Sequence, residues 1–205
     1  MLNNMNLKIV ILSAFLIITA NLSAQESVPA PVYKDGDVWV FKVAEKRTAS
    51  STRALDGDYE VTFKGGKFIV RRPGGEKTET RQDVGQLRDL LNEQDNEKQL
   101  LQFPLSLGKK WTTQYEADTR AENQDRRRNG ETKVTGTEQI TTPAGTFRAF
   151  KIERYETAAL KKKTERGTYT YYYSPEVGGI VKYAYEREGG AATTMELIKY
   201  TPAAR

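Results

Sequence analysis

Short runs of β-branched and aromatic residues, separated by turns rich in glycine and proline, recur along most of this chain. Within the runs apolar and polar residues alternate, as where Tyr59, Val61 and Phe63 are spaced by polar residues. A period of two places alternate side chains on opposite faces of a strand. The pattern therefore predicts a mainly β, antiparallel domain. The expected strands are Asp37–Val43, Asp58–Phe63, Lys67–Arg72, Lys110–Asp118, Thr146–Tyr155, Gly167–Tyr173, Ile180–Arg187 and Ala192–Tyr200.

The turn signals indicate how these strands connect. Gly65-Gly66 predicts a tight hairpin, and Asn129-Gly130 predicts a second hairpin between two polar arms that span 117–142. One helix is expected over Asp83–Glu93, because its apolar residues recur at helical spacing. The expected number of strands, about nine or ten, exceeds that of an ordinary open sheet, and only one helix is available to cover a face. We therefore expect a curved sheet that forms a half-barrel or incomplete barrel, ahead of a closed eight-stranded barrel or a sandwich.

The N-terminus has the residue pattern of a targeting segment. Lys8 precedes an apolar run over Ile9–Thr19, and small residues follow up to Ala24. This layout is typical of a secretory signal peptide, and the run is shorter than a membrane-spanning helix needs. We expect cleavage near Ala24, no retained transmembrane segment, and a periplasmic location, with the extracellular space as the alternative. The expected organisation is a signal peptide (1–24), an extended leader (25–32), one β domain (33–200) and a loose tail (201–205).

Two residue types are missing from the sequence, which contains no His and no Cys. Histidine-based triads, imidazole metal ligands, thiolate nucleophiles, disulfides and a lipidated cysteine are thereby excluded. No glycine-rich phosphate loop is present either. The sequence predicts no catalytic residue, no metal site and no cofactor, and the protein is expected not to be an enzyme.

Three motifs carry weak functional signals. Ser106–Lys109 matches S-x-x-K, but the companion elements of the serine enzymes that use it are absent. The triplets Asp35–Asp37 and Asp56–Asp58 fit ordinary turn chemistry better than calcium binding. The basic runs Arg126–Arg128 and Lys161–Lys163 suggest contact with an anionic surface, or simply solvated loops. A net charge of +5 on an exported chain does not favour nucleic acid as a partner.

Aromatic residues cluster on single faces of the expected strands. Such rows pack across strands in many sheets, and they also line ligand cavities. If the inner face of the sheet binds a ligand, these residues are the candidates: Trp39, Phe41, Phe68, Trp111, Tyr115, Tyr171, Tyr173 and Tyr183.

Four stretches of the chain resemble a family of secreted bacterial proteins of unknown function. They are Tyr33–Trp39, Phe103–Trp111, the segment Glu138–Ile152 that contains Pro-Ala-Gly-Thr-Phe, and Tyr171–Gly178. The resemblance implies a periplasmic β half-barrel similar in shape to the LolA-like lipoprotein carriers. It implies no activity, since the family has no established catalytic residues.

Three functions follow as hypotheses. The first is a non-enzymatic binding module that holds an apolar or amphipathic ligand, such as a lipid, on a concave sheet. The second is a structural or interaction module of the cell envelope, which would use the polar hairpin 117–142 to bind an envelope protein or an anionic surface. The third is a carboxylate-based hydrolase of wall glycans, for which no acidic pair stands out.

Overall fold

The computed structural model describes residues 27–46, 56–75, 77–81, 100–116, 127–160 and 163–204. Twelve strands and no helix lie in these ranges. The predicted helix Asp83–Glu93 and the predicted signal peptide lie outside them. No helix in the described ranges is long and apolar enough to cross a membrane. The expectation of a mainly β, antiparallel protein is confirmed.

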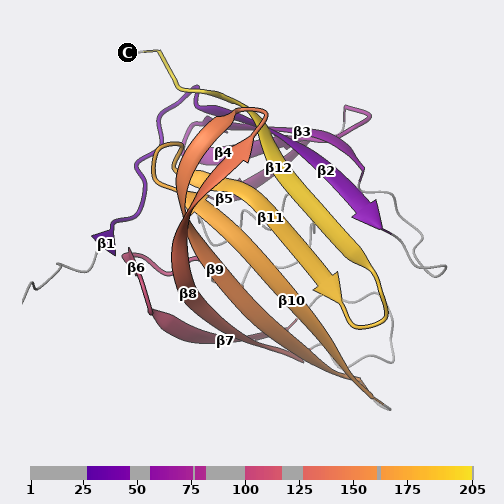
Figure 1. Ribbon diagram of the computed structural model, residues 1–205. Helices are drawn as coiled ribbons and strands as arrows, with labels where there is room; N and C mark the ends of the chain where they lie inside the picture. Colours follow the sequence, from indigo (N-terminus) through magenta and orange to yellow (C-terminus); the bar gives the residue numbers. More distant parts are fainter. Residues whose placement is uncertain are drawn as a thin grey trace, which may run out of the picture.

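Ten strands form one antiparallel sheet, which is open because β5 and β7 are unjoined edges (Figure 1). Its spatial order is β5-β4-β3-β2-β12-β11-β10-β9-β8-β7, and β1 (Ser27–Val28) pairs separately with β6 (Leu105–Ser106). The other strands are β2 (Val38–Lys46), β3 (Gly57–Lys64), β4 (Lys67–Arg71), β5 (Lys77–Arg81), β7 (Lys110–Glu116), β8 (Arg127–Thr142), β9 (Gly145–Leu160), β10 (Lys163–Ser174), β11 (Gly179–Arg187) and β12 (Ala192–Thr201).

Two meanders meet at the pair β2–β12. Strands β2 to β5 follow one another to one edge, and β7 to β12 follow one another from the other edge. The predicted turn at Gly65-Gly66 joins β3 to β4, and Pro143-Ala144 joins β8 to β9. Gly65 and Gly66 have φ of 61° and 75°, values that only glycine adopts readily. The tip of the β8–β9 hairpin folds over β11 and β12 (Figure 1), and there Ala144 N donates a hydrogen bond to Leu197 O at 3.3 Å.

The prediction of a hairpin turn at Asn129-Gly130 is wrong. Both residues lie inside β8, where Asn129 pairs with Gln114 and Gly130 pairs with Thr113. The backbone of Gly130 does not have positive φ, so this glycine is not required for a turn. Residues 117–126, which complete the predicted polar hairpin, lie outside the described ranges.

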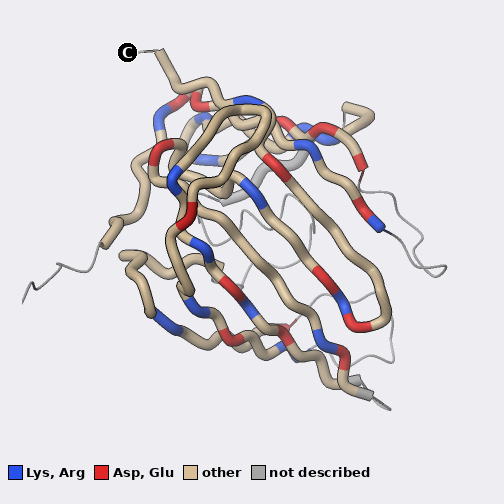
Figure 2. Tube along the Cα trace, in the orientation of Figure 1, with Lys and Arg blue, Asp and Glu red and all other residues tan. Residues whose placement is uncertain are grey.

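One face of the sheet, here called the inner face, carries the core. In β2, Trp39, Phe41 and Val43 are buried while Lys42 and Ala44 are exposed, and β3, β4 and β7 alternate in the same sense. Charged residues of both signs are interspersed along the strands (Figure 2). Residues outside the sheet join the inner-face core: Leu100, Leu101, Leu105 and Val177.

The N-terminal segment is fastened to the sheet by hydrogen bonds. Tyr33 donates its hydroxyl to Gly178 O at 3.0 Å, and Trp39 Nε1 donates to Val177 O at 2.8 Å. Asp37 is buried, and its carboxylate accepts the backbone N–H of Lys34 at 2.8 Å and of Ala203 at 2.9 Å. Asp37 therefore joins the two ends of the β domain, which is a structural role for the first D-G-D triplet.

We expect Asp37→Ala to lower the free energy of unfolding by about 1–3 kcal/mol, because two partly buried N–H groups would lose their acceptor. Urea unfolding of the wild type and the variant measures the difference. Asp58→Ala, on the exposed face of β3, is the control and should change little. Equal effects of the two substitutions would contradict the role given to Asp37.

Two buried tyrosines make stability depend on alkaline pH. Burial raises the pKa of Tyr33, with smaller contributions from Tyr173 and Asp37, and burial likewise raises the pKa of Tyr173. A folded-state pKa above the unfolded value of about 10 means that the folded protein holds the proton more tightly. This difference in pKa contributes fully to the free energy of unfolding below pH 10. The contribution is lost as the pH rises through the folded-state pKa values of the two tyrosines.

We therefore expect urea midpoints to be flat from pH 8 to pH 9.5 and to fall above about pH 10. Absorbance titration at 295 nm should show fewer than the 11 tyrosines ionising before the chain unfolds. Ionisation of all tyrosines near pH 10 with no loss of structure would contradict this.

Candidate functional site

All eight aromatic residues predicted to line a ligand face are buried on the inner face, with exposures from 0% to 7%. They fall into separate groups. Trp39 and Phe68 pack together with Tyr33 and Phe63, while Tyr171 packs on Tyr183 with ring centroids 5.2 Å apart. Within these two groups the aromatic rings pack against one another. Their part in ligand binding stays a prediction.

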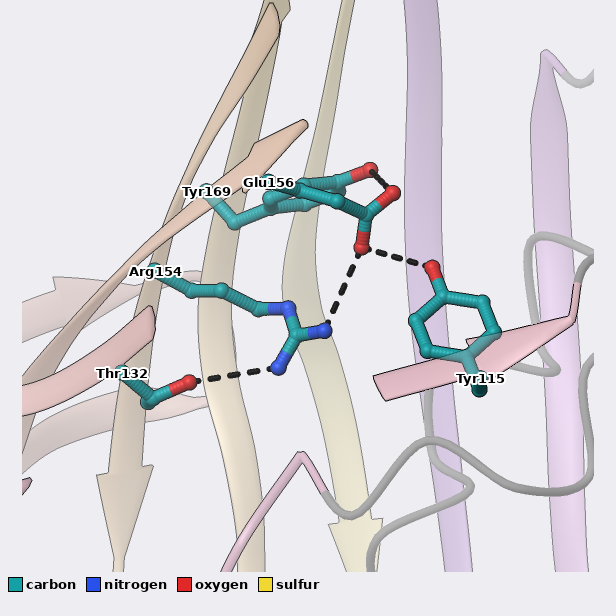
Figure 3. A network of polar contacts seen from close by, with 5 residues as sticks. All are labelled: Tyr115, Thr132, Arg154, Glu156 and Tyr169. Atoms are coloured by element: carbon teal, nitrogen blue, oxygen red, sulfur yellow. Dashed lines mark hydrogen bonds and ion pairs between the residues drawn. The ribbon is translucent and has the colours of Figure 1, made fainter. Parts of the chain in front are cut away.

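A buried polar network interrupts this apolar face toward the β7 edge (Figure 3). Its centre is the ion pair between Arg154 and Glu156 on β9, with Arg154 Nη2 and Glu156 Oε2 3.3 Å apart. Arg154 is 0% exposed and Glu156 is 7% exposed. Residues two apart on a strand share a face, so both charges point inward together with Ile152.

Hydrogen bonds surround both charges. Glu156 Oε2 accepts the Tyr115 hydroxyl at 2.6 Å, and Oε1 accepts the Tyr169 hydroxyl at 3.2 Å. Arg154 Nη1 donates to Thr132 Oγ1 at 3.2 Å, and its guanidinium carbon lies 6.0 Å from the centre of the Tyr115 ring. Ionised groups in an apolar interior need such partners. Glu156 is thus held as an acceptor by three donors, a poor arrangement for a group that must gain and lose a proton.

One donor of the network lacks a partner. Arg154 Nε is buried and makes no hydrogen bond within the described part of the chain. A buried unpaired donor of a charged group is costly, so it needs an explanation. Either it is the cost of an otherwise well-packed ion pair, or it marks the position where an acceptor binds.

Gly130 makes the space for Arg154. A Cβ built on Gly130 would lie 2.1 Å from Arg154 Nη2 and 2.2 Å from Cζ, far inside contact distance. Gly130 pairs directly with Glu156 across β8 and β9, so the guanidinium lies over the backbone of β8. This glycine is required for close approach of a side chain, which corrects its predicted role in a turn.

An opening adjoins the network at the end of β7. The cavity has a volume of about 720 Å³ and is lined by Gln114, Tyr115, Glu116 and Arg127. Tyr115 therefore belongs both to this opening and, through its hydroxyl, to the buried ion pair. Of the eight predicted residues, it is the one that reaches the network.

Sequence reasoning missed Thr132, Arg154, Glu156 and Tyr169. The signal available was the alternation of Ile152, Arg154, Glu156 and Ala158, in which two charges occupy positions of the apolar face. The S-x-x-K motif and the second D-G-D triplet have structural roles, whereas Arg126, Lys161 and Lys162 of the two basic runs lie outside the described ranges. Lys109 Nζ donates to the backbone oxygens of Gln102 and Pro104, and Asp56 accepts the N–H of Glu45 at 2.8 Å. Within the described ranges no group of three or more acidic residues is placed to hold a metal ion.

The network lies in the part of the chain that a family model recognises. The model of the DUF3108-like domain matches residues 93–197, more than half of the 205-residue chain. The chain belongs to the DUF3108-like family. This match covers β7 to β11 and most of β12, so every residue of the network lies within the DUF3108-like region. The name of the family marks a domain of unknown function, in agreement with the uncharacterised family expected from the sequence.

One solved structure shares the fold at low identity, and two others align with most of the chain at lower TM-scores. A candidate lipoprotein from Parabacteroides distasonis aligns with a TM-score of 0.50 and 16% identity, covering 86% of this chain and 100% of its own. A candidate exported protein with a YmcC-like fold from Bacteroides fragilis has a TM-score of 0.39 and 12% identity, with coverages of 85% and 99%. The hypothetical lipoprotein YmcC from Escherichia coli has a TM-score of 0.45 and 10% identity, with coverages of 82% and 86%.

No curated protein matches the chain. The comparisons support an uncharacterised DUF3108-like protein whose structural neighbours are named as exported proteins or lipoproteins. This DUF3108-like chain contains no cysteine, the residue to which a lipoprotein anchor is attached. The similarity to LolA-like carriers stays a prediction.

Substitution of Gly130 by alanine tests the close approach to Arg154. We expect Gly130→Ala to destabilise the protein by about 2–4 kcal/mol, because the added methyl group displaces a buried guanidinium from its partner. In an Arg154→Ala background the same change should cost less than about 1 kcal/mol, since the clash is gone. Urea unfolding of the wild type, the two single variants and the double variant gives the coupling energy between Gly130 and Arg154.

The matched control is Gly136→Ala, also on β8, where an added Cβ would meet no atom within 4 Å. It should have little effect in either background. The same cost of Gly130→Ala with and without Arg154 would contradict the close packing.

Proposed function

We propose that this DUF3108-like protein is an exported, non-catalytic binding protein of the cell envelope. Its ligand would be an amphipathic molecule, with the polar group at the Tyr115–Arg154–Glu156 end of the inner face and the apolar part along the tyrosines of β10 and β11. The observation that carries this proposal is that Tyr115 lines the opening beside β7 and also donates to the buried carboxylate of Glu156.

The chemistry of this end suits a polar group. The opening offers the amide of Gln114, the carboxylate of Glu116 and the guanidinium of Arg127. Deeper in, Arg154 Nε is an unused charged donor among the described residues, and charged donors form the stronger hydrogen bonds with anionic acceptors. A carboxylate or phosphate head group would supply the acceptor.

The inner face beyond the network suits an apolar chain. Tyr169 stacks on Tyr171 with ring planes 3° apart, and both pack on Tyr183. Because these rings are buried, a chain would enter by separating side chains that touch one another in the structure described here. Stacked aromatic rings keep much of their contact with an inserted apolar chain, which limits the free-energy cost of that rearrangement.

Two other parts of the proposal, the exported location and the non-catalytic role, rest on separate observations. The predicted signal peptide and the names of the structural neighbours support export, with the periplasm as the proposed compartment. Saturation of Glu156 by three donors and engagement of Lys109 by backbone oxygens support a non-catalytic role.

Exchange of the buried ion pair tests the proposal. The double variant Arg154→Met/Glu156→Gln removes both charges together, so that no unpaired charge is left in the core. We expect the variant to stay folded and to bind cis-parinaric acid, a fluorescent fatty acid, at least 10-fold more weakly than the wild type. Thermal unfolding followed by circular dichroism verifies that both proteins are folded.

The control is Lys151→Met/Glu153→Gln on the opposite face of the same strand, where the two side chains form an ion pair of 3.2 Å. It should leave binding of parinaric acid unchanged. No binding by the wild type, or equal losses in the two double variants, would overturn the proposal.

A second candidate is an interaction module of the envelope. It is favoured by the position of β7 at one edge of the ten-stranded sheet, since edge strands can pair with another chain. The polar segment that suggested this function differs from its prediction, since residues 127–142 form one continuous strand with no turn at Asn129-Gly130.

A further inference from the structure

The face opposite the core carries a groove across β7, β8 and β9. It has a volume of about 490 Å³, and the outward side chains that line it include Lys110, Thr112, Glu131, Lys133 and Tyr155. Strand register places these residues in two rows. The first row, from β7 through β8 to β9, is Lys110, Lys133 and Glu153. The second row, in the same strand order, is Thr112, Glu131 and Tyr155.

Tyr155 is an exposed aromatic side chain in this groove. It is 61% exposed, whereas the buried tyrosines of the inner face, such as Tyr169, Tyr171 and Tyr183, are at most 3% exposed. Within the described part of the chain its ring stacks on no other ring and its hydroxyl makes no hydrogen bond. An aromatic ring with a free face on a rigid strand offers an apolar surface with a polar tip, and it loses little entropy on binding.

Lys110 and Lys133 form a pair of like charges without a counter-ion. They are directly opposite on neighbouring strands, an arrangement that destabilises a sheet. Neither ammonium group makes an ion pair with a described residue. By contrast, nearby Lys151 pairs with Glu153 at 3.2 Å, so that carboxylate already has a cationic partner. Two adjacent unpaired ammonium groups favour an anionic group between them.

We propose that this groove binds an acidic polysaccharide, with a carboxylate or phosphate group between Lys110 and Lys133 and a sugar ring against Tyr155. The hydroxyl of Thr112 would donate or accept a hydrogen bond with a sugar hydroxyl group, and the carboxylate of Glu131 would accept one. The mixture of a free aromatic face, two cations and polar acceptors in an open groove suits a hydroxyl-rich anion better than a lipid chain. The site lies on the other face from the proposed amphipath site and does not depend on it.

Isothermal titration calorimetry against short oligosaccharides tests this inference. The acidic probes are tetragalacturonate and a phosphorylated oligosaccharide, and the neutral probe is maltotetraose. We expect one of the acidic probes to bind at least 10-fold more tightly than the neutral one at low salt, and the preference to shrink in 0.5 M NaCl because salt screens exposed charges.

Variants identify the residues. Lys110→Gln/Lys133→Gln should remove the preference for acidic probes, and Tyr155→Ala should weaken binding at least 10-fold, while Tyr155→Phe keeps the ring and the affinity. Lys182→Gln, an exposed lysine of β11 outside the groove, is the control and should change nothing. Failure of both acidic probes to bind more tightly than maltotetraose, or equal losses in the Lys182 control, would overturn the proposal.

Discussion

The structure depends on the pairing of β2 with β12. Residues 38–46 pair with residues 192–201, and this long-range ladder joins a meander of four strands to a meander of six. Without it neither meander could bury its apolar face beside the other. Hydrogen bonds from Tyr33 and Trp39 to the turn that precedes β11, and from Ala203 to Asp37, hold the same junction from its two ends. The single inner-face core is a consequence of this junction.

An open sheet with one buried face leaves few places for buried charge. Arg154 and Glu156 occupy such a place, and their position is made possible by a glycine on the neighbouring strand and by two tyrosine hydroxyl groups. An apolar pair of similar size would satisfy packing at least as well. The retention of a charged pair beside an opening is the reason to connect it with recognition of a polar group, and the exposed groove of β7 to β9 gives the opposite face a different chemistry.

Much of the fold could be predicted from the sequence, because local alternation and turn residues determine individual strands. The strands β9 to β12 follow from alternation within a few residues, whereas the turn signal at Asn129-Gly130 wrongly divides β8 into two arms. The pairing of β2 with β12 could not be predicted this way, since it joins segments about 150 residues apart and depends on the core as a whole. Asn129-Gly130 misled the prediction because glycine serves both for turns and for close packing.

The inward orientation of the aromatic residues could be predicted from the sequence, whereas the buried charges could not. Trp39, Phe68, Tyr171 and Tyr183 all face inward as the alternation predicted. Arg154 was missed because a charge at an apolar position of one strand is explained only by Gly130, Thr132 and Tyr115, which come from other strands. A sequence read one strand at a time does not show such partners.

Native mass spectrometry of the protein purified gently from its own cell envelope tests the central claim most directly. The account predicts a stoichiometric added mass that is released by organic solvent and carries a carboxylate or phosphate group. Protein that is free of added mass under conditions that preserve known lipid complexes would contradict the claim that the inner face holds an amphipathic ligand.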